Sequence, residues 1–323
     1  MEMRRCLAAA LLSLGLSQSP TQAQVYPDRV VKLIVPYSPG TPPDGAARII
    51  AQQLQSRFGQ SFLVENRPGG GTTIGVKSVV TAPPDGYTLL IAAPVIAYYS
   101  VLYPHLDFDP LKSLAPVATV FTWSHLMVVA PSVPAKTMGE LVAHAKANPG
   151  KVVFGFGSGT TPHVLGSTFK QVTGLDLLSV PFRGGEQARA ELLGGRVHIN
   201  MAPVSTLLAL VQDGRARALA FTGPARSPDL PDVPTMTESG LPQVGYDPDA
   251  WVGILAPANT PPAIVNRLNA AMNESLKSPE METLARKLGY ERKITTPQEF
   301  AAFLAREREK WPPLIIAAGI QPN

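Results

Sequence analysis

Two hydroxyl-rich and glycine-rich segments each lead from an apolar run into a helical pattern. One reads YSPGTPPDG and starts at Tyr37, and the other reads GSGTTPH and starts at Gly157. Exposed backbone N–H groups and hydroxyls at a helix start attract an anion, because the helix dipole is positive there. An ordinary capped helix start without a ligand is the alternative. The candidate binding residues are Tyr37, Ser38, Pro39, Gly40, Thr41 and Asp44 in the first segment, and Gly157, Ser158, Gly159, Thr160, Thr161 and His163 in the second.

The first segment is the poorer donor of the two. Its pattern predicts Thr41 as N-cap, Pro42 as the first helical residue and Asp44 as the acid that closes a capping box. Two prolines at the start leave the helix only about two of its usual four free N–H groups. An anion there would depend on the Ser38 hydroxyl and on the amides of Gly40 and Thr41.

The second segment and the loop after the next apolar run are better donors. Thr161 is the predicted cap of the second helix, with Pro162 as its first residue. The following loop contains Arg183, Gly184 and Gly185 before another helix, and an arginine can hold a carboxylate with two hydrogen bonds. A solvated loop arginine is the alternative.

Catalytic and metal-binding patterns are sparse. The glycine spacing around Ser158 does not fit a nucleophile elbow, and the five histidines form no pair at metal-ligand spacing. We therefore expect no catalytic residue, no metal site and no cofactor. His163 is either a ligand donor or a half-buried surface residue. Tyr37, Trp123 and Phe182 fit either the core or a wall that stacks against a ligand.

The amino terminus predicts export. Arg4 and Arg5 precede an apolar stretch of roughly 11 residues, which is too short for the ~20 that span a bilayer, and small residues follow up to Ala23. We expect residues 1–23 to be a signal peptide cleaved after Ala23 and the mature protein to be periplasmic. The single cysteine, Cys6, lies in the removed segment, so disulfides and thiolate metal sites are excluded.

Charge argues against nucleic acid as a partner. The chain has 28 Lys and Arg against 24 Asp and Glu, so its net charge is only +4. Charged residues make up 16% of the chain, below the roughly 25% of an average soluble protein, and no basic cluster stands out. We expect no nucleic-acid partner.

Alternating apolar runs and helical patterns predict an α/β fold with parallel sheets covered by helices. The length predicts two domains. We assign residues 24–123 and 253–323 to lobe 1 and residues 124–252 to lobe 2, with crossings near 119–126 and 246–252. The predicted strands are 30–36, 62–65, 87–92, 126–130, 152–156, 178–182, 197–201, 216–221 and 252–256.

Six motifs in order resemble the Bug family of extracytoplasmic solute receptors: YPDRVVKLIVPYSPG, VENRPGGGTTIG, DGYTLL, GSGTTPH, LLGGRVHI and WVGILAP. The resemblance implies a type II periplasmic-binding-protein fold, in which two α/β lobes close on a small carboxylate in the cleft between them. It also implies one large and one small membrane subunit of a tripartite tricarboxylate transporter as partners. Three positions of this chain differ from the family pattern. Thr41, followed by two prolines, replaces a glycine of the family, His198 replaces an acidic residue, and Ala202 replaces a polar residue.

The leading hypothesis is a monomeric periplasmic receptor for a small organic acid, and both a dicarboxylate and an aromatic acid are compatible with it. A second hypothesis keeps the fold and makes the protein a ligand sensor for a membrane signalling partner. A third, an exported hydrolase, depends only on Ser158 and His163.

Overall fold

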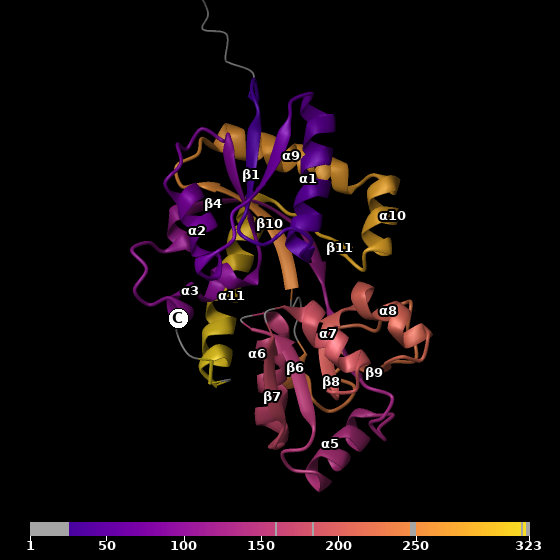
Figure 1. The fold of residues 1–323 in the computed structure, drawn as a ribbon. Helices are drawn as coiled ribbons and strands as arrows, with labels where there is room; N and C mark the ends of the chain where they lie inside the picture. The colour runs from indigo at the N-terminus through magenta and orange to yellow at the C-terminus, as the bar shows by residue number, and fades with distance from the viewer. Residues whose placement is uncertain (1–25, 159, 183, 246–249, 318, 321–323) are drawn as a thin grey trace, which may run out of the picture.

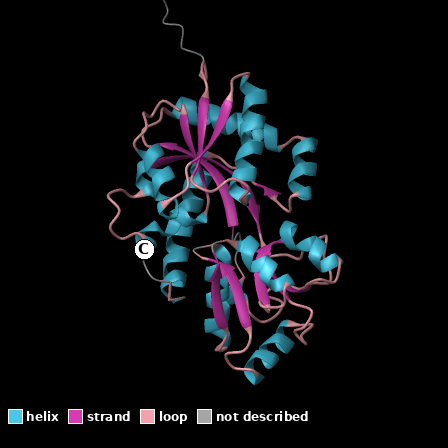
Figure 2. Cartoon of the chain, in the orientation of Figure 1, coloured by secondary structure: helices cyan, strands magenta, loops and turns pink. Residues whose placement is uncertain are grey.

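The chain forms two α/β lobes, one above the other in Figure 1. The computed structural model describes residues 26–158, 160–182, 184–245, 250–317 and 319–320. The predicted signal segment, Gly159 and Arg183 lie outside the described residues. Figure 2 shows strands at the centre of each lobe with helices around them.

Lobe 1 contains a six-stranded sheet in the order β11-β4-β10-β3-β1-β2. β1 pairs in parallel with β2 and β3, whereas β10 runs antiparallel to β3 and β4. The strands are β1 (Val31–Val35), β2 (Phe62–Asn66), β3 (Thr88–Ala92), β4 (Leu114–Trp123), β10 (Ala250–Pro257) and β11 (Glu291–Arg292).

Lobe 2 contains a five-stranded sheet in the order β7-β6-β8-β5-β9. β6 pairs in parallel with β7 and β8, and β5 runs antiparallel to β8 and β9. The strands are β5 (His125–Val129), β6 (Val153–Gly157), β7 (Leu178–Phe182), β8 (Ile199–Pro203) and β9 (Arg217–Phe221).

Helices connect most strands and cover the sheets (Figures 1 and 2). The α-helices are α1 (Pro42–Phe58), α2 (Thr73–Val80), α3 (Tyr99–Leu102), α4 (Pro110–Ser113), α5 (Met138–Ala147), α6 (Thr161–Thr173), α7 (Gly185–Leu193), α8 (Val204–Gln212), α9 (Pro262–Leu276), α10 (Pro279–Lys287) and α11 (Pro297–Ala317). The 3-10 helices are η1 (Gly70–Thr72), η2 (Pro94–Tyr98) and η3 (Pro242–Val244).

The nine predicted strands are confirmed, with ends shifted by one or two residues. The expectation of parallel sheets holds only in part, because each sheet combines parallel and antiparallel pairs. β4 was missed because Pro116 and two threonines interrupt its apolar pattern, and most of it pairs with β10. β10 is antiparallel because the chain re-enters lobe 1 from the side of lobe 2. Our exact lobe boundaries stay a prediction; residues 250–252, which we assigned to lobe 2, belong to β10 of the lobe 1 sheet.

Each lobe has its own apolar core, and helix α11 joins them by an additional contact. Val164 of α6 packs in one buried cluster with Tyr98 of η2 and Trp311 of α11. The buried Glu307 carboxylate accepts hydrogen bonds from the indole N–H groups of Trp251, at 2.9 Å, and Trp311, at 2.7 Å. The carboxyl-terminal helix is therefore fixed to β10 at the point where it reaches lobe 2.

Candidate functional site

The predicted loops of the two lobes face one another. Figure 1 shows the carboxyl end of β1 pointing toward lobe 2, and the carboxyl ends of β6 and β7 pointing toward lobe 1. In sheets of this kind, ligands bind beyond the carboxyl ends of the strands, where loops lead into helices. The candidate site therefore comprises loop 37–44 of lobe 1 and loops 157–163 and 183–185 of lobe 2.

Asp44 organises the lobe 1 loop from within. Its carboxylate is 3% exposed and accepts hydrogen bonds from the Gly40 N–H at 2.9 Å and the Asn66 side chain at 2.9 Å, and it pairs with Arg48 at 3.1 Å. Burial alone would raise the pKa of Asp44, but these hydrogen bonds and the Arg48 charge hold it below its usual range. The negative charge of Asp44 is thus already matched inside the protein.

The lobe 1 loop has fewer free donors than we predicted. Thr41 is the N-cap of α1 and Pro42 its first residue, as expected, but the Thr41 side chain makes no capping bond, and Asp44 bonds the Gly40 amide instead of closing a box on Thr41. Thr41 directs both its amide, at 3.4 Å, and its hydroxyl, at 2.8 Å, to the Ser38 carbonyl. The Gly40 and Thr41 amides, on which we expected an anion at this loop to depend, thus already have partners within the loop.

Helix α6 of lobe 2 begins one residue earlier than predicted. Thr160 is the N-cap and Thr161 the first helical residue. The Thr160 hydroxyl donates to the Gly157 carbonyl at 2.7 Å, and the Thr160 carbonyl accepts from the His163 amide at 3.0 Å. This arrangement fixes the loop and leaves the start of α6 directed at the gap between the lobes.

The start of α7 lies beside the start of α6. A Cβ added at Gly157 would lie 3.0 Å from the backbone nitrogen of Gly185 and 3.2 Å from the carbonyl carbon of Gly184. The Ser158 amide donates to the Phe182 carbonyl at 3.0 Å, which joins the ends of β6 and β7. Two helices of 13 and 9 residues thus direct their positive ends at one place.

His163 packs against an aromatic side chain of lobe 2. Its imidazole stacks on Phe156 with ring centroids 4.2 Å apart and planes 10° apart. Burial lowers the pKa of His163 below its usual 6.5 and so favours the neutral imidazole. His163 is the third residue of α6 and is half-buried. It is therefore compatible both with a ligand donor and with a half-buried surface residue.

Of the other two family positions that differ in this chain, His198 directly precedes β8 and Ala202 lies in β8. The His198 imidazole accepts from the Val153 amide at 2.9 Å and so joins β8 to β6. Ala202 is buried in β8 opposite Leu126 of β5. His198 is therefore a structural residue of the sheet.

The predicted aromatic residues lie apart from one another. Trp123 is 6% exposed at the end of β4, and its ring centroid is 5.2 Å from that of Tyr290, a residue that sequence reasoning missed. The Tyr290 hydroxyl donates to the Pro42 carbonyl at 3.4 Å, next to the lobe 1 loop. Burial raises the pKa of Tyr37, and nearby tyrosines add to this effect. Phe182 is half-buried in β7.

A cavity of about 670 Å³ extends between the lobes beside Trp123. Its walls come from lobe 1 and lobe 2, and it contains no residue of the three predicted loops. The lining residues are Trp123, Ser124, Val204, Phe221, Ala225, Arg226, Ser227, Pro228, Asp229, Glu282, Ala285, Arg286, Gly289, Tyr290, Glu291 and Arg292.

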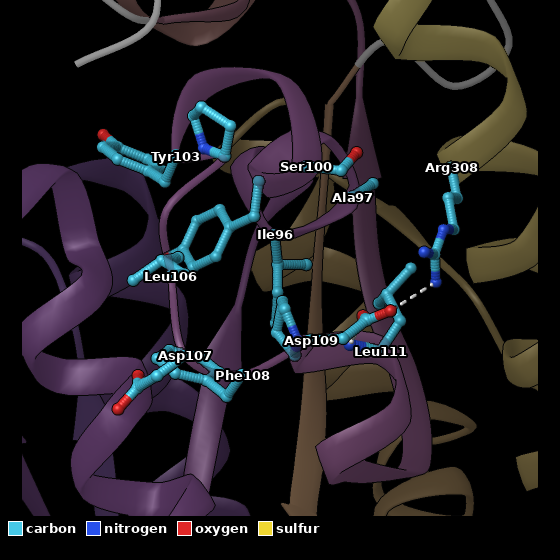
Figure 3. Close-up of a pocket in the computed structure, with 13 residues that line it drawn as sticks. Ile96, Ala97, Ser100, Tyr103, Leu106, Asp107, Phe108, Asp109, Leu111 and Arg308 are labelled. Carbon is cyan, nitrogen blue, oxygen red and sulfur yellow. Dashed lines mark hydrogen bonds and ion pairs between the residues drawn. The ribbon is translucent and has the colours of Figure 1, made fainter.

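A second cavity, of about 390 Å³, lies in lobe 1 between η2, α3, α4 and α11 (Figure 3). Figure 3 shows the Arg308 guanidinium directed at the Asp109 carboxylate, 2.9 Å away. Asp109 also caps α4 by accepting from the Leu111 amide. This cavity too contains no residue of the predicted loops. Two of its charged residues, Asp109 and Arg308, pair with each other.

The residues that the structure describes hold no group of three or more histidines, cysteines and acids that could bind a metal ion. Within the same residues, no helix is both long and apolar enough to cross a membrane.

Two α/β lobes whose helix starts face each other across the gap between them define a two-lobed solute-binding protein. Residues 46–320 match the Tripartite tricarboxylate transporter family receptor, TctC, and the chain belongs to this family. The resemblance to Bug receptors is thereby confirmed, together with the two-lobe α/β fold of periplasmic solute-binding proteins.

Known proteins align with nearly the whole chain. Protein BugT of Bordetella pertussis is 33% identical over 326 residues, covering 99% of this chain and 99% of BugT. An adipate-bound protein of R. palustris is 32% identical with a TM-score of 0.83, covering 92% of this chain and 100% of that protein. MatC of Rhodopseudomonas palustris with bound malate is 28% identical with a TM-score of 0.78, covering 90% of this chain and 100% of MatC.

Proposed function

We propose that this protein is a periplasmic receptor that captures a small organic carboxylate between its lobes and delivers it to the large and small membrane subunits of a tripartite tricarboxylate transporter. It acts as a monomer, without a cofactor and without catalysis. Membership of the receptor family supports the transport role. The adipate and malate found in two structural neighbours support the carboxylate.

The observation that carries the proposal is the convergence of α6 and α7 at Gly157. Backbone N–H groups at two adjacent helix starts form an anion site without a charged side chain. The Thr160 hydroxyl is used within the loop, where it donates to the Gly157 carbonyl, so the proposed site depends on backbone N–H groups. The ligand carboxylate is held here in lobe 2, and lobe 1 closes over it.

The energy required is modest. Micromolar affinity corresponds to about −8 kcal/mol. Hydrogen bonds to a charged group contribute about 1.5 to 3 kcal/mol each, so several of them supply this affinity after ordering costs. Because Arg48 balances the charge of Asp44 and Asn66 donates a hydrogen bond to it, the lobe 1 loop repels an approaching carboxylate less than a free Asp44 would.

Isothermal titration calorimetry of the folded, ligand-free mature protein tests the proposal. A panel of organic acids is titrated beside the neutral amide of each acid. We expect at least one acid to bind with micromolar or better affinity and its amide to bind far more weakly. Failure of every acid to bind would contradict the proposal.

The transport role has a separate test. Native mass spectrometry of protein isolated from its own periplasm identifies the carried ligand, and uptake of that ligand is then measured in a strain that lacks the gene. Loss of uptake is the expected result. Normal uptake with lost induction of ligand-responsive genes would favour the sensor hypothesis instead.

A further inference from the structure

The cavity of about 670 Å³ between the lobes contains no residue of the candidate carboxylate site, but one of its walls contacts the lobe 1 loop. Trp123 and Tyr290 of lobe 1 form one wall, and Val204 and Phe221 of lobe 2 contribute to the other. Because the Tyr290 hydroxyl bonds to the Pro42 carbonyl, the first wall begins at the first residue of α1. The cavity therefore lies beside the lobe 1 loop.

The lobe 2 wall lies at the same edge of its sheet as the helix pair. β6 and β8 are parallel neighbours, so their carboxyl ends lie at one edge of the sheet. β6 ends at Gly157, where α6 and α7 meet, and β8 leads directly into Val204 at the start of α8. A ligand held at Gly157 can thus extend along this edge toward the cavity.

The arginines of the cavity wall already have carboxylate partners, and Arg286 and Arg292 share that of Glu282. Each arginine of the wall is paired with a glutamate: Arg226 with Glu238 at 2.9 Å, Arg286 with Glu282 at 3.0 Å and Arg292 with Glu282 at 3.2 Å. Asp229 adds a further carboxylate to the lining. A second carboxylate on the ligand would meet no unpaired arginine of this wall.

The backbone amides of the lobe 1 loop give a second carboxylate little help either. Pro42 and Pro43 have no N–H group, and the amides of Gly40 and Thr41 are bonded within the loop.

At α6 of lobe 2, Pro162 also has no N–H group and the amides of Thr160 and His163 are bonded within the loop, which leaves the Thr161 amide. Helix α7 has no proline in its first turn, so most of the remaining anion donors lie at its start.

What the cavity does offer is aromatic surface. The rings of Trp123 and Tyr290 pack with centroids 5.2 Å apart at the wall. The Trp123 indole N–H is buried and has no hydrogen-bond partner among the described residues. Aromatic side chains contribute a large apolar contact area and stack on planar groups.

We propose that this cavity receives the uncharged, aromatic-sized body of the ligand, whose single carboxylate is held at the starts of α6 and α7. The proposal depends on the proposed function and narrows it. The preferred substrate class is the aromatic monocarboxylates, and Trp123 is a specificity-determining residue.

Matched pairs of ligands test the charge. Calorimetry compares 4-methylbenzoate with terephthalate, and hexanoate with adipate, on the ligand-free mature protein. We expect each monocarboxylate to have an affinity at least about tenfold higher than that of its dicarboxylate partner, because one unmet charged hydrogen bond has an effect of this size. We also expect 4-methylbenzoate to bind more tightly than hexanoate. Equal or tighter binding of the dicarboxylates would overturn this inference and leave the proposed function intact, whereas no binding by any acid would overturn both.

Tryptophan fluorescence tests the location. Trp251 and Trp311 are fully buried and bonded to Glu307, so Trp123 is the tryptophan at the cavity. We expect ligand to change the emission of the wild-type protein and of the Trp311→Phe control, but not of Trp123→Phe. Trp123→Ala lowers affinity about tenfold or more. An emission change that persists in Trp123→Phe would overturn the proposal, even if Trp123→Ala fails to fold.

Discussion

A side chain on Gly157 would place its Cβ 3.0 Å from the backbone nitrogen of Gly185. That approach is tighter than an ordinary van der Waals contact, so a side chain at this position would push the start of α7 away by a few tenths of an ångström. The carboxylate site we propose depends on this contact, because the backbone N–H groups of both helices must reach the same ligand oxygen atoms.

Substitution Gly157→Ala is expected to separate α7 from α6 and to lower carboxylate affinity about tenfold, the loss of about one charge-assisted hydrogen bond. Calorimetry measures the affinity, and circular dichroism confirms folding. Gly139→Ala is the matched control, since a Cβ at that position in α5 of lobe 2 meets only Thr137, at 3.9 Å. Unchanged affinity in a folded Gly157→Ala protein would argue against the convergent site.

Substitution Asp44→Asn is expected to lower the free energy of unfolding by about 1 to 3 kcal/mol, because it removes charge-assisted bonds to Gly40, Asn66 and Arg48. Urea denaturation measures the change. Asp213→Asn, at an exposed site that follows α8, serves as control and should change stability by less than about 0.5 kcal/mol. If both variants behave alike, Asp44 does not hold the loop.

Protonation of His163 is expected to reduce stability at low pH. Burial lowers the pKa of His163 in the folded protein, so below about 6.5 the unfolded chain binds the proton more readily. Its contribution to the free energy of unfolding is therefore complete above pH 6.5 and declines as the pH falls through 6.5 toward the lower folded pKa.

Urea denaturation at pH 7.5 and pH 5 checks this expectation. The stability difference between the two pH values should be smaller in His163→Gln than in the wild-type protein. His105→Gln, on the exposed surface, controls for the loss of an imidazole. A difference as large in His163→Gln as in wild type would show that another group is responsible.

Substitution Glu307→Ala is expected to destabilise the protein by about 3 to 5 kcal/mol, because it leaves the Trp251 and Trp311 indoles and the Lys310 ammonium without their buried carboxylate. Glu307→Gln, which keeps one acceptor oxygen, should cost less. Glu309→Gln, at an exposed position of the same helix, is the control. A stability loss no larger in Glu307→Ala than in Glu309→Gln would contradict the role of Glu307 in fixing α11.

Apolar runs predicted nine strands because each strand carries its own local pattern. β4 escaped because Pro116 and two threonines interrupt its apolar pattern, and only its pairing with the distant β10 shows that it is a strand. The α6 cap was misplaced by one residue because Thr160 and Thr161 are equally good caps, and only the hydrogen bond from Thr160 to Gly157 decides between them.

Contacts between distant residues account for the rest of the site. The sequence placed Asp44 in a capping box, but its partner Asn66 belongs to the next strand and gave no local signal. Tyr290 follows α10 near the carboxyl terminus, and nothing in its neighbours indicates a contact with Trp123. The cavity between the lobes, formed by such contacts, could not be inferred from motifs.

The most direct test of the carboxylate site is a crystal structure of the mature protein with an acid that calorimetry shows to bind. We predict that the carboxylate oxygen atoms lie within hydrogen-bond distance of backbone N–H groups at the starts of both α6 and α7. A carboxylate bound elsewhere, with those two helix starts in contact only with water, would contradict the account.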